Sequence, residues 1–127
     1  MVRTTLVKEW IEAGEKLTQA LDDAKFGVVA SLWFYDPDTD EWRLIIASPL
    51  VDREGPLHAY REIQKALGAL QQKDVSLSDI SAVSPSHDLI KLLRIALKTG
   101  AGISGIRFTR NRINDQFIED SYIYRLT

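Results

Sequence analysis

Two segments with the alternating pattern of β-hairpins, one near each end of the chain, constrain the fold more than any other feature. The first spans residues 26–48 and turns at residues 36–40, and the second spans residues 103–126 and turns at Asn114-Asp115. Both are rich in β-branched and aromatic residues, and turn-forming residues interrupt each of them. The pattern therefore predicts antiparallel strand pairs that contribute to a sheet.

A five-residue turn at residues 36–40 predicts the pairing within the first hairpin, because it leaves one face of the hairpin wholly apolar. The other face then carries Trp33 beside Arg43 and Tyr35 beside Glu41. The apolar pairs of this register are Phe34 with Trp42, Leu32 with Leu44 and Ala30 with Ile46.

A two-residue turn at Asn114-Asp115 predicts the pairing within the second hairpin. One face then holds Arg107 opposite Tyr122, together with Tyr124. The core face holds the apolar side chains, and the pairs are Ile106 with Ile123, Phe108 with Ser121, and Arg110 with Glu119.

Helical patterns and one short strand lie between and before the hairpins. Apolar residues at helical spacing predict helices over residues 6–24, 56–70 and 86–98, with a strand at 78–83 and a loop at 50–55. Pro56 suits the first turn of the second helix, and Ser86 is expected to cap the third. The predicted fold is a single α+β domain over residues 1–127, of order αββαβαββ. Its mixed five-stranded sheet has helices packed mainly on one face.

Composition limits the classes of protein that fit. A chain of 127 residues with 45% hydrophobic and 27% charged residues suits one globular domain with a real core. The absence of cysteine excludes disulfides, thiolate chemistry and cysteine-based zinc sites. No apolar stretch is long enough to span a bilayer, and the first five residues lack the apolar segment of a signal peptide. We therefore expect a cytoplasmic protein.

The sheet face that carries Trp33 is the strongest candidate for a binding surface. Trp, Tyr and Arg are enriched at interface hot spots, and Trp33 beside Arg43 could form a cation–π pair. The alternative is that a helix covers this face as a second core layer. The arginines favour an interface, because a buried charge needs a partner. The predicted binding residues are Trp33, Tyr35, Arg43, Arg107, Tyr122 and Tyr124.

Two motifs resemble ligand loops but lack essential parts. The carboxylates of Asp36, Asp38 and Asp40 alternate as at the start of a calcium loop, yet the glycine at the sixth position and the glutamate at the twelfth are missing. The glycine-rich residues 99–105 follow a helix and precede a strand, whereas a phosphate loop follows a strand and opens a helix. We therefore predict an acidic turn and a helix stop, with no metal and no cofactor.

The two histidines support a second interpretation. His58 and His87 are both expected near helix starts, after strand ends, where α/β proteins often place binding loops. Together with Arg53 they are the weak catalytic candidates of a small enzyme or ligand-binding protein with a polar pocket at the strand ends. No carboxylate lies at ligand spacing from either histidine, which favours exposed residues without a catalytic role.

A third interpretation is nucleic-acid binding through basic residues of the C-terminal part. Residues 85–127 hold seven Lys and Arg against four Asp and Glu, although the whole chain has a net charge of −2. The overall acidity disfavours phosphate binding. The basic residues concerned are Lys91, Arg94, Lys98, Arg107, Arg110 and Arg112.

These observations favour a non-enzymatic protein-interaction module of accessory, regulatory or immunity type. The expected assembly is a homodimer through the aromatic and arginine-bearing face of the sheet, with another protein as the alternative partner. No motif names a reaction, so enzymatic activity is not predicted, and no membrane partner is expected.

Overall fold

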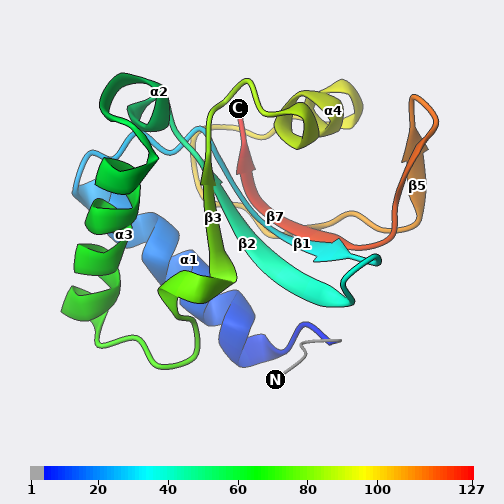
Figure 1. The fold of residues 1–127 in the computed structure, drawn as a ribbon. Coiled ribbons are helices and arrows are strands. Elements are labelled where there is room, and N and C mark those ends of the chain that lie inside the picture. Colours follow the sequence, from blue (N-terminus) through cyan, green and yellow to red (C-terminus); the bar gives the residue numbers. More distant parts are fainter. Residues whose placement is uncertain (1–4) are drawn as a thin grey trace.

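A sheet of five strands lies at the centre of the molecule, and the computed structural model describes residues 5–127 around it (Figure 1). The strands are β1 (Ala30–Asp36), β2 (Glu41–Ala47), β3 (Ile80–Val83), β4 (Ile106–Arg107) and β7 (Ser121–Leu126). They lie in the order β3-β2-β1-β7-β4, with β2 and β3 parallel and the other neighbours antiparallel. This confirms the predicted α+β fold with a mixed five-stranded sheet.

The helices agree with the sequence pattern except at two places. Residues 50–55, predicted to be a loop, contain a short helix. His87 occupies the N-cap position predicted for Ser86, and its Nδ1 accepts a hydrogen bond from the amide of Leu89 at 3.2 Å. In residues 5–127 the α-helices are α1 (Lys8–Asp23), α2 (Leu50–Glu54), α3 (Pro56–Leu70) and α4 (Asp88–Ala96), and a 3₁₀ turn covers Leu77–Asp79.

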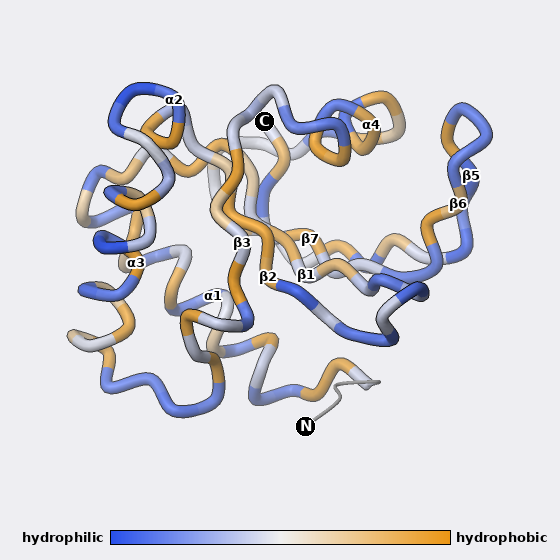
Figure 2. The backbone as a smooth tube through the Cα atoms, viewed as in Figure 1, coloured by the Kyte–Doolittle hydropathy of each residue, from blue (hydrophilic) through white to orange (hydrophobic). Residues whose placement is uncertain are grey.

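Both faces of the sheet are covered. α1 and α3 pack on one face, and α4 packs on the other (Figure 1). The buried side chains accordingly form two clusters, one per face, and Figure 2 shows the hydrophobic residues concentrated along the central strands. The first cluster includes Leu17, Leu21, Trp33, Trp42, Leu44, Ile46, Ile63 and Tyr124. The second includes Leu32, Ile45, Ile90, Leu93, Ile113, Ile118 and Ile123.

The register predicted for the first hairpin is wrong by one residue. Trp42 lies opposite Tyr35 and not opposite Phe34, and Trp33 lies opposite Leu44 and not opposite Arg43. The loop has four residues instead of five, because Asp36, the first residue of the expected turn, pairs with Glu41 and extends the strands. Since both faces of this hairpin are buried, an apolar face could not distinguish the two registers.

The register predicted for the second hairpin is confirmed. Ile106 lies opposite Ile123 and Arg107 lies opposite Tyr122. The turn residues Asn114 and Asp115 have φ angles of 47° and 67°, as a two-residue hairpin turn requires. The hairpin does not remain in one sheet, because its outer part forms a separate two-stranded sheet of β5 (Asn111–Ile113) and β6 (Gln116–Ile118).

We call residues 111–118 the arm. It stands beside α4 and away from the main sheet (Figure 1). The bend at its base includes Arg110, whose φ angle is 48° and whose amide donates to the carbonyl of Glu119 at 3.0 Å. Ile113 and Ile118 are buried in the second core cluster, so one side of the arm is fixed to the body of the protein.

Candidate functional site

The centre of the predicted binding face is core. Trp33 and Tyr124 are both 0% exposed and lie beneath α1. α1 can approach this closely because it has Gly14 at the contact: a Cβ at that position would lie 2.3 Å from the hydroxyl of Tyr124 and 2.9 Å from Nε1 of Trp33. The open-face prediction is therefore wrong for these two residues, and a helix covers them as a second core layer.

The polar atoms of the two aromatic side chains are paired inside the protein. Nε1 of Trp33 donates to the carbonyl of Trp10 at 3.2 Å and to the hydroxyl of Tyr124 at 3.1 Å. That hydroxyl donates in turn to the carbonyl of Ile11 at 2.6 Å. Burial raises the pKa of Tyr124. These hydrogen bonds attach α1 to the sheet, so the two side chains have a structural role.

Arg43 also has a structural role. Because of the changed register it lies on the opposite face from Trp33, and the proposed cation–π pair does not form. Its guanidinium donates to the hydroxyl of Ser81 and to the carbonyls of Ser78 and Ile80, each at 2.9 Å. Arg43 therefore holds β3 and the turn before it against β2.

The remaining predicted residues gather at one end of the covered face. Tyr35 packs on Trp42, with ring centroids 5.5 Å apart, and the guanidinium of Arg107 lies 5.7 Å from the centroid of the Trp42 ring. That distance is within cation–π range. Tyr122 is half-buried beside Tyr124. Tyr35, Arg107 and Tyr122 thus keep part of their surface in solvent, and they pack around Trp42, which is itself buried.

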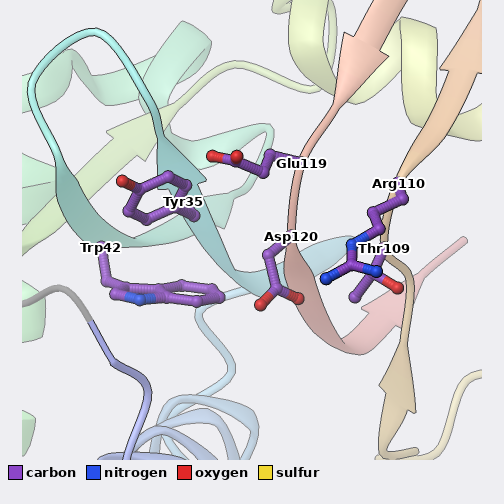
Figure 3. A pocket seen from close by; sticks show the side chains of 6 residues that line it. All are labelled: Tyr35, Trp42, Thr109, Arg110, Glu119 and Asp120. Atoms are coloured by element: carbon purple, nitrogen blue, oxygen red, sulfur yellow. The ribbon is translucent and has the colours of Figure 1, made fainter.

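A cleft of about 340 Å³ opens at this end, between the β1–β2 hairpin and the base of the arm (Figure 3). Tyr35 and Trp42 form one side, and the carboxylates of Glu119 and Asp120 lie across from them. Arg107 is held in place by Asp120, whose Oδ1 accepts from Nε at 2.7 Å. The lining residues are Tyr35, Trp42, Thr109, Arg110, Glu119 and Asp120.

The turn beside the cleft is built from its own carboxylates. The amide of Asp38 donates to Oδ1 of Asp36 at 2.9 Å, and the hydroxyl of Tyr35 donates to Asp40. The hydrogen bond to Asp40, aided by partial burial, raises the pKa of Tyr35 to about 12. The predicted acidic turn is therefore present, and it orients the half-buried ring of Tyr35.

Negative charge predominates around the cleft. The two turns that border it carry six carboxylates, against the guanidiniums of Arg107 and Arg110. Such a site attracts cations and repels phosphates. The six carboxylates are those of Asp36, Asp38, Asp40, Glu41, Glu119 and Asp120.

The arm presents a contrasting surface next to the cleft. Phe117 is 53% exposed, and it lies directly opposite Arg112, which is also exposed. Sequence analysis paired the strands of the arm but gave no role to Phe117. The signal was present in the alternation: Ile113 and Ile118 share the buried side, which leaves Phe117 on the other.

The histidine-based candidates have little support in this geometry. His58, Arg53 and His87 are all exposed, on α3, on α2 and at the start of α4, and none of them lines the cleft beside Tyr35. His58 lies 3.8 Å from Glu62 one helical turn later. Near these residues, the hydroxyl of Ser84 donates to the carboxylate of Asp52 at 2.9 Å. This hydrogen bond involves none of the three candidates.

The basic residues of the C-terminal part do not form one continuous surface of free cations. Arg94 donates to the carbonyls of Thr127 at 2.8 Å and of Pro85 at 3.1 Å, and Arg107 is paired with Asp120. Over residues 5–127, no three His, Cys, Asp or Glu side chains are grouped so as to hold a metal ion. The same residues contain no helix whose length and apolarity would let it cross a bilayer.

Comparison with known proteins gives no family: no protein-family model matches the chain, and neither curated proteins nor solved structures show significant similarity to it.

Proposed function

We propose that the protein acts by protein–protein association, and that its partner is a second copy of the same chain joined through the arm and the cleft. The observation that carries this proposal is the exposed pair of Phe117 and Arg112 on the projecting arm. Aromatic and arginine side chains are the commonest interface hot spots, and a half-exposed phenylalanine is costly to leave in water.

The chemistry of the cleft complements that of the arm. Arg112 is a cation with a planar fork of donors, which suits the carboxylate of Glu119. Phe117 is an apolar ring, which suits the aromatic side formed by Tyr35 and Trp42. The opposite charges of Arg112 and Glu119 also favour the correct orientation on encounter.

A twofold arrangement uses both surfaces of each copy. In a symmetric dimer the arm of one copy meets the cleft of its partner, and the reverse contact follows by symmetry. The interface is expected to bury at least about 1,000 Å² in total, which is the usual threshold for a specific complex. The negative charge of the cleft makes nucleic acid a poorer partner for this site.

Analytical ultracentrifugation of charge-reversed variants tests the proposal. Wild type is expected to be dimeric at high micromolar concentration, and Arg112→Glu and Glu119→Arg are each expected to be monomeric. An equimolar mixture of the two variants should form dimers again, because both symmetric contacts then pair Arg with Glu.

The control is Arg61→Glu, which reverses one exposed charge on α3 and should leave the dimer intact. A monomeric wild type would overturn the proposal. So would a dimer that both single variants retain, since the dimer would then use another surface.

A further inference from the structure

The two outer edges of the five-stranded sheet differ in how they are covered. β3 forms one edge and β4 forms the other. At β3 the amide of Ala82 donates to the hydroxyl of Tyr60 at 3.0 Å. The carbonyls of Ser78 and Ile80 both accept from the guanidinium of Arg43 at 2.9 Å. Because side chains already occupy these backbone groups, the β3 edge is protected against pairing with another strand.

The edge at β4 is longer than the strand itself. Residues on both sides of β4 continue the pairing with the chain of β7, through three backbone amides that donate across at 2.6 to 3.0 Å. The donors are Ser104, Phe108 and Arg110, and the acceptors are the carbonyls of Tyr124, Ser121 and Glu119. We call residues 104–109 the β4 edge.

Alternate amides of the β4 edge point away from the sheet. In an extended strand successive N–H groups point to opposite sides, so those of Gly105, Arg107 and Thr109 face outward when those of Ser104 and Phe108 face β7. The amides of Gly105 and Thr109 find no acceptor within residues 5–127. Gly105 and Arg107 are also exposed. This edge is therefore open to a further strand.

Two side-chain donors lie beside these amides on the face of the sheet that α1 covers. Arg107 and Tyr122 are a cross-strand pair. Asp120 accepts from Nε and Nη2 of Arg107, so the Nη1 side of its fork stays available, and the side chain is 46% exposed. A Cβ at Gly105 would collide with the hydroxyl of Tyr122. Glycine thus lets this ring lie across the β4 edge, where the hydroxyl has no hydrogen-bond partner among the described residues.

The opposite face of the β4 edge is apolar. Ile106 and Phe108 are half-buried and pack against the second core cluster. Cross-strand neighbours in a sheet interact on the same face. A strand added at this edge would therefore meet hydrogen-bond donors on one face and apolar side chains on the other.

We propose that the β4 edge binds an extended peptide of a partner protein as a sixth, antiparallel strand, with a carboxylate facing Tyr122 and Arg107 and apolar side chains facing Ile106 and Phe108. In such complexes the backbone hydrogen bonds supply affinity and the alternate side chains supply specificity. Arginine and tyrosine together suit a carboxylate, which only accepts hydrogen bonds. The proposal does not depend on the dimer, because every copy of the chain carries this edge.

The first test is an NMR titration of the ¹⁵N-labelled protein with the peptide acetyl-Ser-Thr-Val-Glu-Val-Thr-Ser-amide. We expect saturable shifts of the amide signals of Gly105, Arg107 and Thr109, and no shift of Ala82 on the protected β3 edge. Replacing the glutamate of the peptide by lysine should weaken binding roughly tenfold, since a charge-assisted contact becomes a repulsion.

Two N-methylated peptides provide the matched control. Methylation of the glutamate amide should abolish binding, because that amide donates to the β4 edge. Methylation of the next valine amide should leave the affinity within about twofold, because that amide points to solvent. Equal affinity of the two methylated peptides, or the absence of saturable shifts at residues 105–109, would overturn the proposal.

Hydrogen exchange identifies the other possible occupant, which is a second copy of the chain. The amides of Gly105 and Thr109 should exchange freely both in wild type and in Arg112→Glu. If they are protected in a wild-type dimer and exchange freely in a monomeric variant, the edge belongs to the contact between copies, and the peptide proposal is wrong. A monomeric wild type that binds the peptide would overturn only the dimer.

Discussion

The β1–β2 hairpin and the arm are both antiparallel ribbons, but the protein covers the first on both faces and the second on only one. β1 has strands on both sides, helices α1 and α3 below and α4 above. The arm rests on the body through Ile113 and Ile118 and turns Phe117 outward. A covered ribbon contributes stability, whereas a ribbon with one free side has residues available for contacts.

The largest expected effect is a direct test of this difference. Trp33→Ala should lower the free energy of unfolding by about 4 kcal/mol, because it removes a fully buried aromatic ring. Phe117→Ala should change it by less than about 0.5 kcal/mol, because the ring lies half in solvent. Urea denaturation followed by circular dichroism measures both, in monomer-forming conditions. If both substitutions lowered the free energy of unfolding equally, Phe117 would belong to the core.

A smaller effect is expected where α1 covers the first hairpin. Gly14→Ala should destabilise the protein by about 2 kcal/mol, since the new methyl group would collide with the rings of Tyr124 and Trp33. The matched control is Gly68→Ala in α3, where nothing lies within 4 Å of the added Cβ. That change should be neutral or stabilise by up to about 1 kcal/mol, the helix propensity of alanine over glycine.

Thermal or chemical denaturation of both glycine variants gives the comparison. Adding Tyr124→Phe to Gly14→Ala should recover part of the loss, because it removes the hydroxyl closest to the new methyl group. If Gly14→Ala stabilised the protein, α1 could not pack against Tyr124 and Trp33 as closely as the structure indicates.

The smallest effect concerns the turn of the first hairpin. The pKa of Tyr35 is raised to about 12, chiefly by its hydrogen bond to Asp40. This hydrogen bond stabilises the folded protein below pH 10, where the phenol is protonated in both the folded and the unfolded chain. The contribution is lost as the pH rises toward 12 and the phenol ionises. Asp40→Asn should bring the pKa of Tyr35 back toward 10.

Carbon-13 NMR of the tyrosine Cζ atoms measures this titration. Asp38→Asn is the control, because Asp38 is two residues away and is not among the carboxylates that raise this pKa. If both variants lower the pKa equally, a general acidic field, and not the specific contact with Asp40, controls Tyr35.

The two hairpins also differ in how far the sequence could predict them. Asn114 and Asp115 both tolerate a positive φ, and a two-residue turn permits only one register. The acidic turn of the first hairpin allows loops of several lengths, and in this structure only Asp40 within it has a positive φ. Because this hairpin has apolar residues on both faces, the alternation of apolar and polar residues could not decide which loop length, and so which register, is correct.

Alternation also shows only on which face of the sheet a side chain lies, and this explains why the predicted binding face was partly wrong. Alternation correctly placed Tyr122 and Tyr124 on the face of the sheet opposite Ile123. It could not show that α1 covers Tyr124 while leaving Tyr122 at an open end, because cover depends on where a helix docks. Glu119 and Asp120 were missed as well, since they became neighbours of Tyr35 only when the second hairpin divided between two sheets.

The adjacency of β1 and β7 has a consequence for synthesis of the protein on the ribosome. Trp33 hydrogen-bonds Tyr124 across 91 residues of sequence, and β7 lies next to the central strand β1 in the sheet. Until residues 121–126 emerge from the exit tunnel, a nascent chain holds two unfinished apolar faces on either side of β1. Contacts of such long sequence separation form slowly. The core is therefore completed only after residues 121–126 have left the tunnel, and until then the apolar side chains of β1 and β2 lack part of their cover.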